Sequence, residues 1–270
     1  MLGDLHIHTT YSDGSYSNEE VIKMAKEKGL THIAITNHDT TRGLGEAIEL
    51  GKKYGIKVIP GVEISAYDYD RKRRVHILGY NISLEGKNIN NLCSKTLVKR
   101  NSNTLKQAAI LIEEGYDISL ANLSKACETS KVLYKQHIME ELINKHYCDS
   151  IYCELYYRLF KNNGVCAMDI EYVDAKDAVK AIVADGGIPV LAHPGEFDSY
   201  DIIESLVQCG LKGIEINHPK NTTNDVKKIK EYAEKFNLFL TGGTDYHGKY
   251  GDKDIELGDV QSPEEALKIL

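Results

Sequence analysis

The sequence predicts an α/β fold built on a parallel sheet. Two flanking parts of the chain, residues 1–89 and 165–270, alternate short apolar runs of strand type with amphipathic helical patterns, and glycines punctuate them. Repeated βα units favour a parallel sheet, because right-handed crossovers return the chain to the same end of the sheet. The alternation leaves two architectures open, a closed barrel and an open sheet.

The first flank follows this alternation from its beginning. Ser17 and Glu20 form a capping box that starts a helix, and Gly29 ends that helix. A second helix is expected near residues 45–54. Strands are expected at residues 4–8, 32–36, 57–60, 62–65 and 75–80. A charged turn at residues 68–74 joins the last two of these strands.

The second flank repeats the pattern. Asp174 can cap a helix that runs through Ala184, and the continuous apolar run at 188–192 is typical of a buried strand. Further strands are expected at 213–217 and 238–241, with helices near 202–209 and 224–236 before them. A last helix starts at Ser262-Pro263-Glu264-Glu265, which supplies a cap, a proline in the first turn and acidic residues.

Residues 90–164 break this alternation. Four segments have helical patterns, at 96–114, 121–127, 132–147 and 150–162, and no convincing strand lies among them. We therefore predict a helical subdomain, residues 90–164, inserted into a main domain formed by residues 1–89 and 165–270. The chain has few prolines and no Pro/Ser-rich linker, which indicates that the insert packs against the main domain.

Length, composition and charge limit the possible functions. The 270 residues are 42% hydrophobic, enough for one large domain or two small ones, and this excludes a disordered or disulfide-stapled chain. The net charge of -7 argues against binding along long duplex nucleic acid. Residues 87–165, in contrast, hold 11 Lys and Arg against 8 Asp and Glu, a net charge of +3. This stretch suits a flap over an anionic substrate or, equally, an ordinary solvated surface.

Sequence features also predict where the protein works. No apolar run approaches the roughly 20 residues that a membrane span needs, and the amino terminus lacks the layout of a signal peptide. The six cysteines form no CxxC pair, which favours reduced thiols. We expect a cytoplasmic protein without a membrane partner, and the sequence does not indicate its oligomeric state.

Side chains that bind metals recur at the ends of the predicted strands, where parallel α/β folds place their active sites. A lone histidine on an apolar strand is more often a core residue with satisfied hydrogen bonds, and a lone Asp in a turn needs no function. Together these side chains predict a site with several metal ions, because shared ions supply partners to all of them. The nine residues are His6, His8, Asp13, His38, Glu63, His76, His193, Asp245 and His247.

In this order, the residues resemble the polymerase-and-histidinol-phosphatase (PHP) family of metal-dependent phosphoesterases. The resemblance covers residues 1 to about 85 and about 166 to 270. It rests on four motifs: His-x-His at 6–8, Thr-x-His-Asp at 36–39, Ala-His-Pro at 192–194 and Asp-Tyr-His-Gly at 245–248. The resemblance implies a distorted (β/α)7 barrel, similar to a TIM barrel, with a helical insert.

The same resemblance implies three divalent ions, which could be Mn2+, Fe2+ or Zn2+. It assigns the first to His6, His8, Glu63 and Asp245, the second to Glu63, His76 and His193, and the third to Asp13, His38 and His247. Glu63 would bridge the first two ions.

Two residues beside this set have open roles. Many relatives have Asp where this chain has Asn37, but the Asn37 amide can still orient His38 or a neighbour by a hydrogen bond. Asp39 could support a metal ligand, donate a proton or cap the next helix. Either Asp39 or His247 could protonate the leaving oxygen of a substrate.

The insert is similar in position to that of a family branch that hydrolyses nucleotide phosphates, including nucleoside 3′,5′-bisphosphates and the 5′ ends of short RNA. That branch usually carries Arg-Pro-His in its insert, and this chain has Lys135-Gln136-His137. Lys135 and His137 are therefore candidates to bind substrate, with an ordinary helix surface as the alternative.

Other candidates follow from position alone. Arg42 lies shortly after the Thr-x-His-Asp motif and His218 lies at a strand end, so both could contact a phosphate. The run Arg71-Lys72-Arg73-Arg74 favours a solvated turn over a phosphate site. Tyrosines at 147, 152, 156 and 157 have helical spacing, which indicates packing of the insert before base stacking.

These observations predict an enzyme that hydrolyses phosphate esters of a small phosphorylated substrate, a nucleotide or short RNA. A water activated by the first two metals would attack phosphorus. Two alternatives remain: a histidinol-phosphate phosphatase with the same metal set, and a metal-dependent nucleotide-binding module without turnover.

Overall fold

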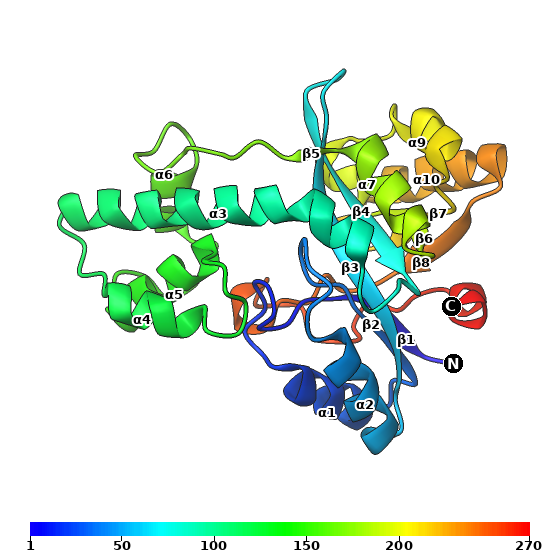
Figure 1. Cartoon of the computed structure of the whole chain (residues 1–270), viewed down its shortest axis with the longest axis horizontal. Helices are drawn as coiled ribbons and strands as arrows, with labels where there is room; N and C mark the ends of the chain where they lie inside the picture. Colours follow the sequence, from blue (N-terminus) through cyan, green and yellow to red (C-terminus); the bar gives the residue numbers. More distant parts are fainter.

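The sheet at the centre of the molecule is a nearly closed barrel. The computed structural model describes residues 1–270, and its strands follow one another in the order β1-β2-β3-β4-β6-β7-β8, with a short β5 beside β3. Backbone hydrogen bonds between β1 and the segment after β8 close the ring, since His8 N donates to Tyr246 O and Tyr246 N donates to His6 O. The expected distorted seven-strand barrel is confirmed (Figure 1). The strands are β1 Gly3–Ile7, β2 His32–Ile35, β3 Lys57–Asp68, β4 Arg73–Tyr80, β5 Val173–Asp174, β6 Ile188–Leu191, β7 Gly213–Asn217 and β8 Phe239–Gly242.

The expectation of a wholly parallel sheet is wrong for β4. Strand β4 runs antiparallel to both β3 and β6, because β3 and β4 form a hairpin with a short turn in place of a crossover helix. The two strands expected at 57–60 and 62–65 are one strand, which changes partner midway. Residues up to Pro60 pair with β2, and Gly61 is the first residue to pair with β4. A Cβ at Gly61 would lie within 3.1 Å of Ile35 O and 3.0 Å of Gly79 O, so the crossing point needs glycine.

Helices cover the outside of the barrel. The capping box of Ser17 and Glu20 is present at the start of α1, and Asp174 caps α7 by accepting a hydrogen bond from Lys176 N. No helix is both long and apolar enough to cross a membrane. The helices of this part are α1 Asn18–Glu27, α2 Leu44–Tyr54, α7 Ala175–Ala184, α8 Pro194–Phe197, α9 Ile203–Cys209, α10 Thr223–Phe236, the 3-10 turn η1 Gly248–Tyr250 and α11 Glu264–Ile269.

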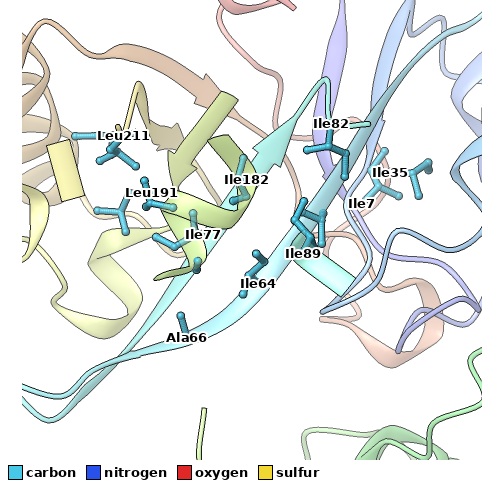
Figure 2. Close-up of a cluster of buried hydrophobic side chains, with 14 of the residues drawn as sticks. Ile7, Ile35, Ile64, Ala66, Ile77, Ile82, Ile89, Ile182, Leu191 and Leu211 are labelled. Carbon is cyan, nitrogen blue, oxygen red and sulfur yellow. The ribbon is translucent and has the colours of Figure 1, made fainter. Parts of the chain in front are cut away.

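The main hydrophobic core lies between the sheet and these helices. Ile64 of β3 and Ile77 of β4 face Ile182 of α7, and Figure 2 shows Leu191 of β6 in the same cluster. Ile89, near the start of α3 (Lys87–Glu113), belongs to this cluster as well. The long helix α3 is therefore anchored in the core of the barrel.

The predicted insert is helical, as expected, and α3 connects it to the barrel (Figure 1). Helix α3 begins at Lys87 and not near residue 96, because the Asp185 carboxylate accepts hydrogen bonds from Asn88 N and Ile89 N and so caps its first turn. Farther along, Ala108 and Leu111 of α3 belong to a separate hydrophobic cluster. That cluster also holds buried residues of α4 Leu120–Ala126, α5 Lys135–Asn144 and α6 Glu154–Phe160.

Candidate metal centre

Glu63 lies at the middle of the candidate centre, on β3. Its Oε2 atom faces three histidines, at 3.1 Å from His8 Nε2, 3.2 Å from His6 Nε2 and 3.3 Å from His38 Nδ1. The Glu63 side chain is 1% exposed, so these contacts are shielded from water.

The other oxygen of Glu63 faces two different histidines. Glu63 Oε1 lies 2.8 Å from His76 Nδ1 and 3.0 Å from His193 Nε2. The carboxylate thus stands between two groups of imidazoles, with one oxygen toward each. This is the placement that a carboxylate needs to bridge two metal ions.

The four residues of the predicted first set meet at one point. Asp245 Oδ1 lies 3.3 Å from His6 Nε2 and 3.2 Å from His8 Nε2, and the ligand atoms of these residues and Glu63 lie within 4.8 Å of one another. A register shift in β1 contributes: Asp4 pairs with Ile33 and Ile7 with Ile35, so β1 has one extra residue at this step. Such a bulge re-aims side chains near its position, and here His6 lies in the bulged step.

The predicted third set is also brought together. Asp13 Oδ1 lies 3.6 Å from His247 Nε2, and Asp13 Oδ2 lies 3.9 Å from His38 Nε2. His8 joins this group, because its Nδ1 lies 3.7 Å from Asp13 Oδ1. The nitrogens of His8 therefore point to both groups, with Nε2 toward Glu63 and Nδ1 toward Asp13.

Hydrogen bonds hold several imidazoles with a ring nitrogen toward the centre. His6 Nδ1 lies 3.0 Å from Glu215 Oε1, so Nδ1 carries a hydrogen and Nε2 is the nitrogen that faces the centre. His247 Nδ1 likewise lies 2.8 Å from the Asp245 carbonyl oxygen, which leaves Nε2 free to face Asp13. Burial lowers the pKa of His38 to about 3, so its ring is neutral, which is the form that binds metals.

Buried polar atoms without partners gather at this end of the barrel. An unsatisfied buried polar atom costs roughly 1–3 kcal/mol, so a cluster of them needs an explanation. Divalent ions among these atoms would satisfy them all at once, and nitrogen and carboxylate donors suit Mn2+, Fe2+ and Zn2+. The residues present therefore fit a multi-metal centre. The atoms are His6 Nε2, His8 Nδ1 and Nε2, Asp13 Oδ1, Glu63 Oε2 and Asp245 Oδ1.

The three carboxylates of the centre are in the form that binds cations. Burial acts to raise the pKa of Glu63, but the histidines around it outweigh burial and hold the pKa well below its usual range. Neighbouring histidines likewise lower the pKa values of Asp13 and Asp245 against the effect of burial.

Glu215 on β7 is a site residue that the sequence analysis missed. It is fully buried, and besides the contact with His6 its Oε2 accepts a hydrogen bond from His193 N at 2.9 Å. The available signal was a single carboxylate between Ile214 and Ile216 in a predicted strand. That pattern fits an exposed carboxylate as well as one that supports a metal ligand. The structure makes Glu215 the group that orients His6.

Replacing Glu215 tests this orienting role. Glu215→Gln keeps the size of the side chain but removes the charge that polarises His6, so metal affinity at the centre should fall roughly 10- to 100-fold. Titration of the metal-free variant with Mn2+, followed by calorimetry, measures the change. Glu204→Gln, on the outer helix α9, is the matched control and should bind like the wild type. Unchanged affinity in Glu215→Gln would contradict the role.

A cavity of about 460 Å3 opens beside the metal ligands. Lys135 and His218, two of the predicted substrate residues, line it. His218 Nδ1 accepts a hydrogen bond from Lys220 N, so Nε2 carries the ring hydrogen, and Nε2 lies 3.7 Å from Asp245 Oδ2. Gln136, between the two predicted residues of the insert, donates a hydrogen bond from Nε2 to Asp13 Oδ2 at 3.1 Å.

The structure does not bring Arg42 and His137 to this cavity. Arg42 is exposed and donates to the carbonyl oxygens of Ser130 and Thr129, both at 2.7 Å, so it ties the barrel to the insert. His137 is buried, neither on a helix surface nor on the cavity wall, and its Nδ1 accepts the hydrogen of Tyr134 N at the start of α5.

Asn37 and Asp39 have structural partners. Asn37 Oδ1 accepts hydrogen bonds from Thr9 N and Ser12 Oγ, which orders the loop before Asp13; it does not bind His38. Asp39 is fully buried and absent from the cavity wall, and its carboxylate pairs with Arg100 at 2.8 Å.

The cavity is also lined by residues for which the sequence favoured other roles. The sequence indicated packing for the tyrosines and a solvated turn for the basic residue. Tyr152, Tyr156 and Tyr157 are on its wall, and Tyr156 also packs against the core of the insert. Arg74 reaches the cavity, where it contacts Asp169 and lies over the Tyr172 ring.

Comparisons with known proteins agree with this geometry. The PHP domain model matches residues 4–185. The chain is 47% identical over 251 residues to a phosphoribosyl 1,2-cyclic phosphate 1,2-diphosphodiesterase of Eggerthella lenta, which covers 93% of this chain and 96% of the relative. It is 27% identical over 259 residues to a 3′,5′-nucleoside bisphosphate phosphatase of Chromobacterium violaceum, covering 93% and 90%.

The fold also matches a solved structure. A crystal structure of a Bifidobacterium adolescentis protein, assigned as a metal-dependent phosphoesterase, superposes with a TM-score of 0.89 at 24% identity and covers 99% of this chain and 94% of that one. At that identity the match shows the fold alone. Together with the matched domain and the buried clusters of His, Asp and Glu, it leads to one conclusion: the chain belongs to the PHP family and is a metal-dependent phosphoesterase.

Proposed function

We propose that this chain hydrolyses a phosphate ester of a small ribose compound that carries two phosphate groups. The observation that carries the proposal is a cavity lined both by predicted metal ligands and by three basic residues, Lys135, Lys161 and Arg74. These three residues are close enough to act on one another electrostatically, so they form one cationic group. One phosphate group would bind at the metal ligands and the other at this cationic group.

The two lysines are in place to receive an anion. Neither Lys135 nor Lys161 forms an ion pair with a carboxylate. Burial lowers the pKa of Lys135 to about 8 and also lowers that of Lys161. A partly buried ammonium without a counterion is unfavourable, so an anionic group in the cavity would stabilise the charged form of both residues.

The names of the relatives support the same class of substrate. The Eggerthella lenta protein is named for a phosphoribosyl 1,2-cyclic phosphate and the Chromobacterium violaceum protein for a nucleoside 3′,5′-bisphosphate. Both names describe a ribose that carries two phosphate groups. The higher identity over almost the whole chain favours the cyclic phosphate of ribose as the first candidate substrate.

Nucleotides, as the sequence predicts, are the second candidate. The rings of Tyr152, Tyr156 and Tyr157 on the cavity wall offer faces on which a base could stack. A nucleoside bisphosphate or the 5′ end of a short RNA would use these rings, whereas a ribose phosphate without a base would leave them uncovered.

The residues of the centre divide the chemical work. Three ions, Mn2+, Fe2+ or Zn2+, held by the nine ligands would supply an activated water and positive charge for the phosphate oxygens. His218 can donate its Nε2 hydrogen to an oxygen of the substrate. Of the two proposed proton donors, only His247 lines the cavity, but its Nε2 faces Asp13 in the third set. Binding a metal and donating a proton are therefore competing uses of that nitrogen.

The test is hydrolysis by Mn2+-loaded protein of five compounds: phosphoribosyl 1,2-cyclic phosphate, adenosine 3′,5′-bisphosphate, adenosine 5′-phosphate, a 5′-phosphorylated RNA pentamer and histidinol phosphate. Phosphorus NMR follows the cyclic phosphate, because its first hydrolysis opens the ring without freeing phosphate, and phosphate release follows the other four. A ribose with two phosphate groups should be the best substrate, by about 10-fold or more in kcat/KM over adenosine 5′-phosphate, since each charged contact is worth roughly 1.5–3 kcal/mol. Equal turnover of histidinol phosphate would contradict the proposal.

Variants locate the preference in the cavity. Lys135→Gln combined with Lys161→Gln should remove the advantage of the second phosphate and leave turnover of adenosine 5′-phosphate near the wild-type value. Lys125→Gln, on the exposed side of α4, is the matched control within the insert. A double variant that keeps the full preference would show that these lysines do not bind the second phosphate.

A further inference from the structure

Arg100 is a partly buried cation that the metal centre does not use. It comes from α3, the helix that links the barrel to the insert, and its side chain is 18% exposed. Its Nη2 atom donates to Asp39 Oδ2 at 2.8 Å and to Ser65 Oγ at 3.0 Å. These contacts bring a guanidinium of the insert helix to the end of the barrel that holds the metal ligands.

Asp39 fixes the orientation of this guanidinium. The Asp39 carboxylate is fully buried and its Oδ1 accepts a hydrogen bond from Ser65 N at 2.9 Å, so it cannot rotate freely. The ring of Tyr134 lies on the guanidinium, 5.2 Å from Cζ to the ring centroid. A carboxylate on one edge and an aromatic ring on one face hold the planar group in a single pose.

The rest of the guanidinium is unused. Both side-chain hydrogen bonds of Arg100 come from Nη2, and Nε is buried without a partner. Arginine carries its donors in a rigid fork, so fixing Nη2 also fixes the direction of the Nη1 donors. No hydrogen bond within the protein uses Nη1, so its donors are left for a ligand in the cavity that Arg100 lines.

The guanidinium lies beside the metal ligands and on the same cavity. Ser65 Oγ is 3.0 Å from Arg100 Nη2 and 3.3 Å from His38 Nδ1, so one hydroxyl separates Arg100 from a predicted ligand of the third ion. Arg100, His38 and Asp13 all line the cavity, and Asn103, one turn along α3, lines it too. An anion held at the metal centre would be within reach of this edge of α3.

We propose that Arg100 binds a non-bridging oxygen of the phosphate group that is hydrolysed, and that Asp39 is the residue that positions Arg100 for this contact. The inference rests on the proposed phosphoesterase site but not on the second phosphate group. Because Asp39 already balances the charge of Arg100, the contact depends on the geometry of the fork more than on net charge. Lysine, a point charge, should therefore replace it poorly.

The experiment uses the full chain loaded with Mn2+. Calorimetry measures its affinity for inorganic phosphate, which is the probe, and a kinetic assay gives kcat and KM for an aryl phosphate. Arg100→Lys keeps the charge that Asp39 needs and should weaken phosphate binding roughly 10- to 100-fold. Arg100→Gln alone leaves Asp39 unpaired and could unfold, so Arg100→Gln with Asp39→Asn removes both charges and should weaken binding equally. Lys106→Gln, on the exposed face of α3, is the control.

Two further readouts separate binding from architecture. Metal content and melting temperature should stay near wild type in Arg100→Lys, and Asp39→Asn should raise KM by a smaller factor, because Arg100 remains but is less well held. Wild-type phosphate affinity in both Arg100→Lys and the double variant would overturn the proposal. Loss of metal together with affinity would also overturn it, since Arg100 would then be a structural tie.

The aryl phosphate carries one phosphate group, which keeps this result independent of the substrate panel. Weaker phosphate binding by Arg100→Lys, without any preference for ribose compounds that carry two phosphate groups, would leave Arg100 in its role and refute the proposed substrate class. A preference for ribose compounds with two phosphate groups, together with wild-type phosphate binding by Arg100→Lys, would refute the role of Arg100 and leave the proposed substrate class standing.

Discussion

Glu63→Gln should lose phosphoesterase turnover by more than roughly 100-fold while the protein remains folded. Loss of a group that only orients a ligand costs about 10- to 100-fold, and Glu63 does more, because its two oxygens face different groups of histidines. The amide keeps the size of the side chain but loses the negative charge that the cations share. Metal analysis of the purified variant, together with phosphate release, measures both effects.

The control for this variant is Glu49→Gln, a change of the same chemistry on the exposed face of α2. It should retain the metal content and turnover of the wild type. Circular dichroism should show that Glu63→Gln keeps its helices and strands. A Glu63→Gln protein with full metal content and normal turnover would show that Glu63 does not bridge the ions.

Removing the metals should lower the melting temperature by at least about 5–10 °C, the shift expected for one ion. Each ion that binds only the folded state adds about 2.7 kcal/mol at a concentration of 100 times its Kd. For a chain of this size, a loss of about 2.7 kcal/mol in unfolding free energy at one site lowers the melting temperature by about 5–10 °C. Without ions, buried carboxylates and imidazoles lose the partners that satisfy their unpaired atoms. Scanning calorimetry before and after chelation measures the change.

Reloading distinguishes metal binding from damage by the chelator. Adding Mn2+ back should restore the melting temperature of the wild type, whereas Glu63→Gln should recover only part of it. A wild-type protein that melts at the same temperature with and without metal would show that the buried clusters do not need ions to be stable.

The sequence predicted that these His, Asp and Glu side chains gather at one site because their signal is local. Most of them lie at or near the end of an apolar run, and the ends of parallel runs meet at one end of a barrel. His76 reaches the same end from near the start of β4, because β4 runs antiparallel. The spacing of His6 and His8 by two residues predicted both on one strand; β1 ends at Ile7, so His8 lies just after it. The β3–β4 turn was visible as the charged run at residues 68–74. Family motifs supplied the grouping of the ligands, which spacing alone does not give.

The features that the sequence could not predict depend on contacts between distant residues. Helix α3 begins early because Asp185, at the end of α7, caps it. Glu215 orients His6 across the barrel, and Arg100 reaches Asp39 from the insert. In each pair the partners are far apart along the chain, so no pattern of propensity or periodicity joins them. The position of Arg42 depends on distant contacts as well, since it lies outside the cavity and donates to Ser130 O of the insert.

The central claim is that one end of the barrel holds several metal ions around Glu63. Diffraction from Mn2+-loaded crystals near the manganese absorption edge tests it most directly, because anomalous peaks locate each ion independently of activity. We expect three peaks, two of them within bonding distance of the Glu63 carboxylate and one beside Asp13, His38 and His247. A map without a peak at Glu63 from crystals that contain manganese would contradict the account.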